Sequence, residues 1–249
     1  MDKKDIKTIE DLSLNAWPSH QMQLYDGWIL RFSHFYTHRT NCVEQIGVSH
    51  IPVEEKISYC ERVYKRWNTP CIFKITPLVD PSFDRMLEER GYRIEHVTDV
   101  MLCDLNKRPS FPCHEEVTIE TRISDEWIDA LFFIKQNATV THLKIVPSMY
   151  AAIPKDVICA SIRKEGRIIA TGLGILDRDR IGIYAINTDC EYRRQGLARK
   201  ICETLLSTAE TYPGIETAYL QVVSDNTPAI SLYESLGLKK EYQYWFRVK

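Results

Sequence analysis

The segment Arg193-Arg194-Gln195-Gly196-Leu197-Ala198 lies between a stretch with the composition of a strand and a stretch with the periodicity of a helix. Residues 180–188 are rich in β-branched and aromatic side chains and predict a strand, whereas residues from about 196 to 211 predict a long helix. Backbone N–H groups at a helix start lack internal partners and carry partial positive charge. Gly196 permits the close approach of a ligand, and Arg193 and Arg194 add positive charge. The segment therefore predicts a phosphate site at the start of a helix.

Hydrophobic periodicity extends this reading over the whole chain. In the second half it predicts strands at 117–122, 157–164, 167–176, 180–188, 217–223 and 239–248, and helices at 124–136, 147–152, 196–211 and 227–236. In the first half it predicts helices at 6–17, 53–67 and 82–90 and strands at 25–35, 40–46, 71–75 and 92–105, with a turn early in the first strand at Asp26-Gly27. Both halves end in a helix–strand–helix–strand series, which indicates an internal structural repeat.

The order of residues around the phosphate segment resembles the GCN5-related N-acetyltransferase (GNAT) superfamily. The resemblance covers about residues 117–249 and rests on Arg193, Gly196, Ala198, Asn226, Ala229, Leu232, Tyr233 and Gly237. It implies acetyl-CoA as the cofactor, with its pyrophosphate on the loop and its pantetheine arm paired to the preceding strand at Ile186 and Thr188. The implied cofactor-binding residues are Ile186, Asn187, Thr188, Arg193, Arg194, Gln195, Gly196, Leu197, Ala198, Arg199, Asn226, Ala229 and Tyr233.

Two of these residues have a structural alternative. In the superfamily Tyr233 is the usual general acid, because a tyrosine hydroxyl can protonate the departing thiolate of CoA; the alternative is packing in the core beside Leu232 and Leu236. Asn226 lies near the pantetheine arm in the superfamily, but an Asn before a helix is also a good N-cap. The two roles of Asn226 are compatible.

The sequence identifies the general base, which takes the proton of the acceptor amine, less clearly than it identifies the general acid. The central strand 181–186 carries no carboxylate. Asp189, Glu191 and Asp225 are candidate bases, with solvated loop charge as the alternative, and Tyr184 could orient a water molecule. His142 and Tyr184 are candidate substrate-binding residues.

The first half resembles the N-terminal half of two-domain relatives in the segments 27–32 (Gly-Trp-Ile-Leu-Arg-Phe) and 39–41 (Arg-Thr-Asn). It lacks the phosphate loop, so the resemblance implies a degenerate GNAT-like half that builds the fold and walls the substrate pocket. We expect a GNAT-like domain at 1–107, a proline-containing linker at 108–116 and the catalytic domain at 117–249. The expected fold class is α/β (α+β), with tandem GNAT-like folds, each a mixed, mostly antiparallel twisted sheet flanked by helices.

Composition narrows the function classes. The formal net charge is −2, with 32 basic and 34 acidic residues, which gives no footprint for nucleic acid. The N-terminus lacks a signal-peptide core and no run reaches the ~20 apolar residues of a membrane span, so a cytoplasmic protein is expected. The eight cysteines form no CxxC pair and are expected to be mostly buried. His34-x-x-x-His38 lies in a predicted strand and turn, so no metal site is expected.

These observations predict an acetyl-CoA-dependent N-acetyltransferase that acts on the primary amine of a small molecule. Two alternatives remain open: a non-catalytic acyl-CoA-binding or sensing module, and an acetyltransferase for protein lysines or N-termini. The expected partner is the amine alone, without nucleic acid or membrane, and the protein is expected to be a monomer or a homodimer. A dinucleotide-binding fold is excluded because Gly172-x-Gly174 lacks a third glycine and lies mid-strand.

Overall fold

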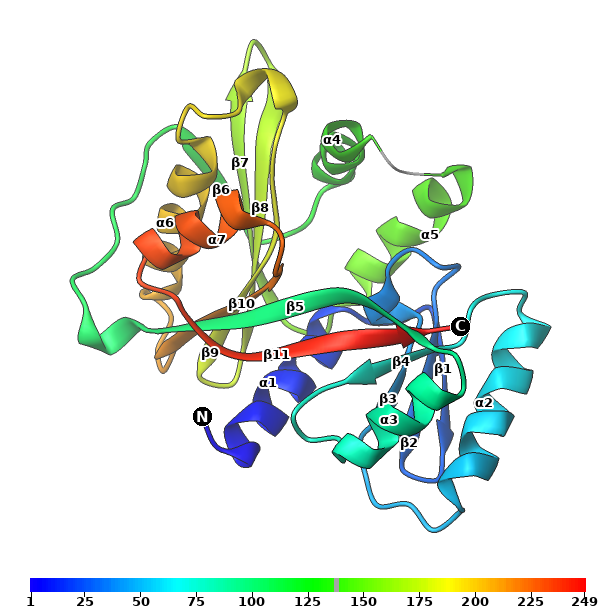
Figure 1. Ribbon diagram of the computed structural model, residues 1–249. Coiled ribbons are helices and arrows are strands. Elements are labelled where there is room, and N and C mark those ends of the chain that lie inside the picture. Colours follow the sequence, from blue (N-terminus) through cyan, green and yellow to red (C-terminus); the bar gives the residue numbers. More distant parts are fainter. Residues whose placement is uncertain (137–138) are drawn as a thin grey trace.

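The computed structural model describes residues 1–136 and 139–249. Within them, eleven strands form one sheet in the order β1-β2-β3-β4-β11-β5-β10-β9-β8-β7-β6 (Figure 1). The strands are β1 (Gln21–Tyr25), β2 (Trp28–Phe32), β3 (Val43–Gln45), β4 (Ile72–Ile75), β5 (Arg93–Asp104), β6 (Val117–Glu120), β7 (Asp156–Lys164), β8 (Arg167–Asp177), β9 (Arg180–Thr188), β10 (Thr217–Val223) and β11 (Lys239–Val248). The helices are α1 (Lys3–Ala16), α2 (Val53–Arg66), α3 (Pro81–Glu89), α4 (Asp125–Lys135), α5 (Val140–Ala151), α6 (Leu197–Ala209) and α7 (Thr227–Ser235), with short 3-10 helices η1 (His38–Thr40), η2 (Leu105–Lys107) and η3 (Cys190–Tyr192).

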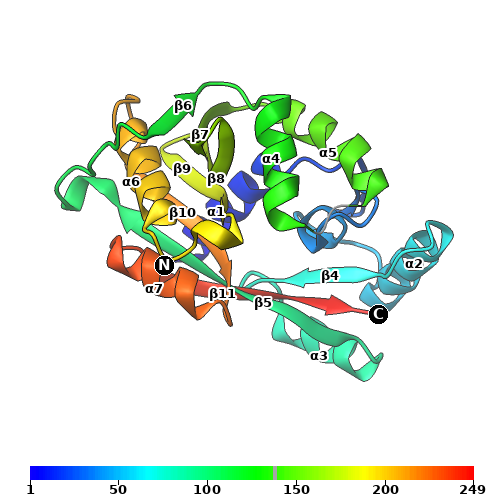
Figure 2. The same ribbon diagram turned by 90° about the horizontal axis from the view of Figure 1, so that it is seen from above.

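The middle of the sheet exchanges strands between the two halves of the chain (Figure 2). β5, the last strand of the first half, pairs antiparallel with β10 of the second half, from Asp104 opposite Thr217 to Thr98 opposite Val223. β11, the last strand of the second half, pairs antiparallel with β4 of the first half and with β5. Each half therefore contributes its last strand to the part of the sheet that the other half builds.

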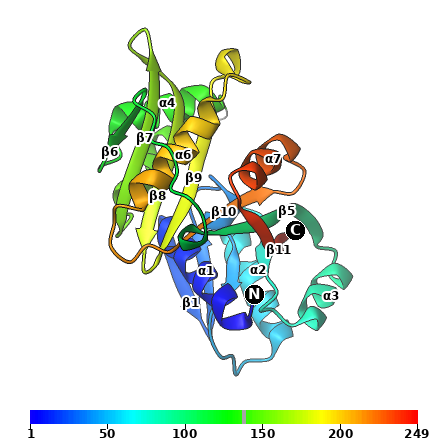
Figure 3. The ribbon, with the colours of Figure 1, turned by 90° about the vertical axis from the view of Figure 1, so that its left-hand side faces the viewer.

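The predicted repeat is present in both halves. The series α2-β4-α3-β5 of the first half corresponds to α6-β10-α7-β11 of the second. Figure 3 shows β6–β9 in the upper part of the molecule and α1–α3 in the lower part, with β5, β10 and β11 between them. The tandem, mixed α/β architecture predicted from the sequence is confirmed.

The turn predicted at Asp26-Gly27 is present and is the two-residue turn of a hairpin, but the predicted bounds 25–35 were wrong, because the strand after the turn, β2, covers only Trp28–Phe32. Asp26 and Gly27 both have positive φ (+43° and +76°), and Tyr25 lies opposite Trp28 in the ladder. Asp-Gly is a favoured sequence for this turn, whose twist matches that of the flanking strands. A Cβ atom at Gly27 would lie 2.2 Å from the carbonyl oxygen of Val48, so glycine is required there. The chain before the turn forms β1, which the sequence analysis missed.

Two further boundaries differ from the predictions. β3 begins at Val43 and not at residue 40, because Thr40 belongs to η1. α5 begins at Val140, well before the predicted residue 147, because Thr139 and His142 form a capping box that starts the helix upstream. Pro147 lies inside this helix.

Close packing of side chains explains the two glycines of β8. A Cβ atom at Gly172 would lie 2.3 Å from Ile201 of α6, and one at Gly174 would lie 2.8 Å from Ile181 of β9, so each glycine makes room for a neighbouring side chain. Six of the eight cysteines are buried, whereas Cys113 and Cys190 are exposed, which confirms the prediction of mostly buried thiols. Among the described residues, no helix combines the length and the apolar character that a membrane crossing needs.

Candidate active site

The loop before α6 exposes backbone donors at the helix start. Gly196 is the N-cap residue with φ +79°, and no side chain caps this helix. Arg194 also has a positive φ, +64°, which is uncommon for a non-glycine residue. A Cβ atom at Gly196 would meet nothing within 4 Å, so the space above the helix start is open. Arg193, Arg194 and Gln195 are exposed around it. The predicted phosphate loop therefore has free donors, free space and adjacent positive charge.

The strand ahead of this loop separates from its neighbour. β9 and β10 pair in parallel from Arg180 opposite Thr217 to Ile183 opposite Leu220, and the pairing stops there. Beyond that point β9 remains paired only with β8 on its other side, through a register shift near Leu173 and a positive φ of +51° at Ala185. Residues 184–188 therefore present a free backbone edge toward β10. The hydroxyl of Thr188, at the end of this edge, is buried without a hydrogen-bond partner.

A cavity of about 250 Å³ opens between the separated strands. Its lining comes from both halves of the chain. The first half contributes Trp17, Thr37 and Arg39; α4 and α5 contribute Leu131, Lys135 and Tyr150; β9 and β10 contribute residues 183–187 and 220–223; and Asn226 and Tyr233 complete it. The hollows of 530 Å³ beside Lys249 and 680 Å³ beside Gly237 contain none of the predicted site residues.

Tyr233 and Asn226 each make a structural contact and also border the cavity. Tyr233 is 8% exposed and packs in the core, yet it also lines the cavity. Burial, and after it the nearby thiol of Cys202, raises the pKa of Tyr233, so the hydroxyl keeps its proton at neutral pH. Asn226 caps α7 by accepting a hydrogen bond from the N–H of Ala229 at 3.3 Å, and it borders the cavity as well.

Tyr184 lies in the cavity wall as part of an aromatic pair. Its hydroxyl is 2.7 Å from the hydroxyl of Tyr219, and its ring meets Trp17 edge-on. Burial raises the pKa of Tyr184 to about 12. The side chain is thus a neutral hydrogen-bonding group at this wall, consistent with orienting water or substrate.

The other candidates from the sequence analysis lie outside the cavity lining. Asp189 accepts a hydrogen bond from the N–H of Glu191 and forms an ion pair with Arg167 at 3.2 Å. Glu191 is largely exposed and lies 4.0 Å from the same Arg167. His142 belongs to the capping box of α5 and packs its ring against Tyr36. These contacts explain the positions of Asp189, Glu191 and His142, and none of them involves the cavity.

The structure also brings residues to the cavity that the sequence analysis did not assign. Arg39, Lys135, Trp17 and Gln221 all line it. Arg39 stands in the Arg-Thr-Asn segment that carried the resemblance of the first half, which was the available signal. No local pattern marks the other three, because they come from the C-cap of α1, from α4 and from β10, and meet only in the folded chain.

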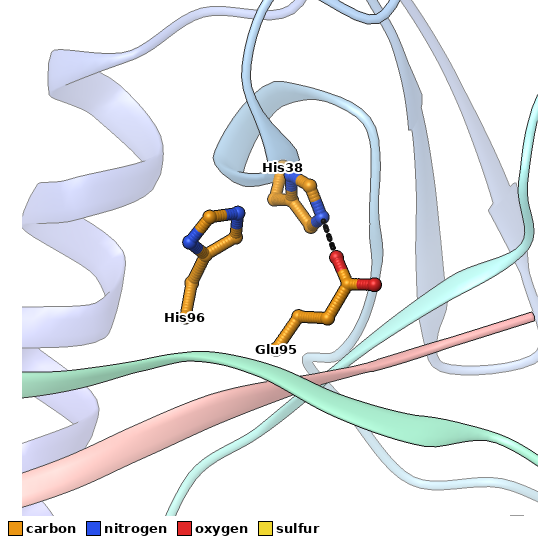
Figure 4. A group of neighbouring side chains, drawn as sticks. All are labelled: His38, Glu95 and His96. Atoms are coloured by element: carbon orange, nitrogen blue, oxygen red, sulfur yellow. Dashed lines mark hydrogen bonds and ion pairs between the residues drawn. The ribbon is translucent and has the colours of Figure 1, made fainter.

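The histidines form a group that the sequence did not indicate (Figure 4). His34 lies in a turn, as predicted, whereas His38 is the first residue of η1. Nε2 of His38 lies 3.1 Å from Oε2 of Glu95, and the ring of His38 meets that of His96 edge-on, so that the three donor atoms lie within 4.8 Å of one another. A hydrogen bond and a ring contact account for this proximity. The group offers three donors, of which His38 and Glu95 already engage each other.

Comparisons with known proteins point to one family. The family described as "Probable histone acetyltransferase Rv0428c C-terminal" matches residues 3–247. The N-acetyltransferase YobR of Bacillus subtilis is 23% identical over 248 residues, which cover 98% of this chain and 99% of that protein. The [ribosomal protein bS18]-alanine N-acetyltransferase of Escherichia coli is 34% identical over 79 residues, which cover 32% of this chain and 53% of that enzyme.

Solved structures show the same fold. A GCN5-related N-acetyltransferase from Kribbella flavida superposes with a TM-score of 0.72 at 17% identity, over 98% of this chain and 95% of that one. A tandem GNAT protein from the clavulanic acid biosynthesis pathway gives a TM-score of 0.69 at 11% identity, over 97% of this chain and 87% of that one.

Proposed function

Since the chain is an N-acetyltransferase that belongs to the GNAT superfamily, within the family described as "Probable histone acetyltransferase Rv0428c C-terminal", we propose that it uses acetyl-CoA to acetylate the primary amine of a small molecule, by direct attack in a ternary complex. The observation that carries this proposal is the combination of an uncapped start of α6, a free edge of β9 just before it in the chain, and a cavity lined by residues 183–187 of β9 and by Tyr233.

The residues along this path fit acetyl-CoA. The pyrophosphate would lie on the N–H groups at the start of α6, where Gly196 leaves open space and Arg193 and Arg194 add charge. The pantetheine arm would pair with the free edge of β9 at residues 186–188, and it offers amide and hydroxyl groups to the unpartnered hydroxyl of Thr188. Asn226 borders the same part of the cavity.

Acetyl-CoA, when bound, supplies the activated thioester. Tyr233 holds a proton beside the cavity and would deliver it to the leaving sulfur atom. Tyr184 would orient the amine or a water molecule. Among the described residues that line the cavity there is no Asp or Glu, so we do not assign the base to a side chain there.

The enclosure of the cavity supports a small acceptor. The relative that acts on a ribosomal protein alanine matches only 79 residues of this chain. Here Trp17, Thr37 and Arg39 of the first half form one wall of the cavity, which is about 250 Å³ in size. A protein acceptor would need an open approach to the thioester. A free amino acid or an amine of similar size should therefore be acetylated faster than a peptide that begins with the same residue.

The proposal is tested by following thiol release from acetyl-CoA with a panel of small amines and peptides. Tyr233→Phe should lower kcat about a hundredfold or more, because a positioned proton donor contributes on this scale. Its affinity for acetyl-CoA should stay unchanged. Tyr212→Phe, which removes a hydroxyl at the end of α6 outside the cavity, is the matched control and should keep full activity.

Two results would contradict the proposal. Tight binding of acetyl-CoA without turnover of any amine or peptide would indicate a sensing module. Turnover of peptides alone would indicate a protein acetyltransferase.

A further inference from the structure

Two cations line the cavity without a carboxylate to balance them. Nε of Arg39 donates a hydrogen bond to the hydroxyl of Tyr244 at 2.7 Å, and in the described part of the chain no acceptor is paired with its two terminal nitrogens. Lys135 is an exposed residue at the cavity; its ammonium group lies 5.9 Å from the centre of the Tyr36 ring and has no ion-pair partner among the described residues, and no Asp or Glu belongs to the lining. Partial burial of its ammonium group, and after it the positive charge of Arg39, lower the pKa of Lys135. The partly buried charge of Arg39 is costly unless a ligand balances it, and exposed Lys135 adds a second positive charge beside it.

Unpartnered hydrogen-bond donors gather in the same place. Nε1 of Trp17 and the hydroxyl of Tyr150 are buried without a partner, and both residues line the cavity. The hydroxyl of Tyr36, which packs against Trp17, is also buried and unpartnered. An indole nitrogen can only donate, and a phenol readily donates. Buried polar groups in native proteins are nearly always satisfied, so this set of donors indicates an absent acceptor.

A network of hydrogen bonds fixes the turn that carries Arg39. Asn41 accepts hydrogen bonds from the N–H groups of Ser33 and Phe35 at 2.7 and 3.0 Å and donates to the carbonyl of Thr37 at 2.6 Å. Arg31 donates to the carbonyl of Arg39 at 2.6 Å. These contacts fix the turn that carries Arg39 into the cavity. They give a function to the two segments of the first half that resemble two-domain relatives.

We propose that the acceptor is a small amine that carries a carboxylate, and that Arg39 and Lys135 bind this carboxylate while the amine faces the thioester. The inference rests on the proposed function and names its substrate class. The planar guanidinium of Arg39 suits a carboxylate, which it can bind with two parallel hydrogen bonds. The indole of Trp17 and the hydroxyl of Tyr150 would supply further donors to the same group.

The two cations would also help the amine to react. A positive charge nearby disfavours the ammonium form of the acceptor, so its pKa falls and more of it is present as the free amine. Its proton can then pass to solvent before the attack. This accounts for a cavity that lacks a carboxylate base among its described lining residues.

The test compares matched pairs of amines: amino acids with the carboxylate at increasing distance from the amine, each beside its own carboxamide. Wild-type enzyme should prefer the carboxylates. In Arg39→Gln and Lys135→Gln, KM for the carboxylates should rise about ten- to hundredfold, the effect of losing a hydrogen bond to a charged group. KM for acetyl-CoA should not change. Arg66→Gln, an exposed site on α2, alters net charge equally and should have no effect.

Arg39→Gln also removes the hydrogen bond to Tyr244, and this variant could fail to fold. Lys135→Gln then still decides the test, because Lys135 is the last residue of α4 and its replacement should leave the fold intact. Equal turnover of carboxylates and carboxamides by wild-type enzyme, unaltered in the variants, would overturn the inference and leave the proposed function standing. A selective rise in KM for succinyl-CoA, with amine KM unchanged, would place the carboxylate on the acyl group and also overturn it. Failure to acetylate any amine would overturn both.

Discussion

Gly196 is the residue on which the proposed acetyl-CoA site should depend most. Its φ of +79° favours glycine, and the space above it is open to a ligand. In Gly196→Asp the new carboxylate would occupy the phosphate position and repel it. We expect affinity for acetyl-CoA to fall below detection in equilibrium binding, while the protein still folds, because the side chain meets no protein atom.

Gly214→Asp separates this effect from backbone strain. Gly214 has φ +82° and open space as well, but it follows the C-terminal end of α6. Both variants should lose a similar free energy of unfolding, about 1–2 kcal/mol for an L-residue in this conformation. Gly214→Asp should bind acetyl-CoA like wild type. If Gly196→Asp folds and binds acetyl-CoA with wild-type affinity, the loop is not the phosphate site.

His38 makes stability depend on pH. Burial is the largest influence on His38 and lowers its pKa, against the partly opposing hydrogen bond to Glu95. The unfolded chain therefore takes up a proton at higher pH than the folded chain does. The contribution of the neutral ring is complete above the unfolded pKa of about 6.5 and is lost as pH falls below it. Chemical denaturation at pH 7.5 and 5.5 should show a larger loss for wild type than for His38→Gln, and equal losses would contradict this account.

At the scale of elements, the second half was predicted closely because its signals are local. The strand 180–188 was placed at the observed bounds of β9, and Ser124 was predicted as the N-cap that it is for α4. Periodicity and capping act within a few residues of sequence, so one chain reveals them. The turn at Asp26-Gly27 was equally local and was predicted, whereas the strand before it, β1, was not.

Other features lay beyond local reasoning. The separation of β9 from β10 follows from where their pairing ends, and the pairing with β8 shifts at the same place. Lys135 and Gln221 reach the cavity from elements that are distant in sequence. Contacts between residues that are distant in sequence depend on the order of strands in the sheet, which could not be predicted from the sequence. The strand–loop–helix geometry around Gly196 could therefore be predicted, whereas the cavity lined by both halves could not.

The start of α7 tests whether Asn226 is more than a helix cap. Asn226→Ala should cost about 1 kcal/mol of stability, the usual price of an N-cap, as should Ser124→Ala at the start of α4. Asn226→Asp keeps the cap but replaces the amide donor with a negative charge. If Asn226 binds the cofactor, KM for acetyl-CoA should rise in both Asn226 variants and stay unchanged in Ser124→Ala. A normal KM in Asn226→Asp would leave only the capping role.

For the whole molecule, we propose a first domain at 1–107, a linker at 108–116 and a catalytic domain at 117–249, joined by strand exchange. β5 lies between β10 and β11, and β11 lies between β5 and β4. Separating the two parts at the linker would leave β10 without β5 and β4 without β11, so that each has an unpaired edge. Exposed strand edges of this kind favour aggregation. The two domains should therefore depend on each other for folding, although each has its own helices.

This dependence predicts a single cooperative unfolding transition. Denaturation followed by tryptophan fluorescence should coincide with that followed by circular dichroism, because Trp28 belongs to the first half and Trp127 to the second. Fragments 1–110 and 111–249 should each be insoluble or largely unfolded alone, and co-expression should restore a soluble complex that binds acetyl-CoA. A folded 111–249 fragment with full affinity for acetyl-CoA would show that the catalytic half does not need β5. Restored binding without restored acetyl transfer would then locate the contribution of the first half at the acceptor wall that carries Arg39.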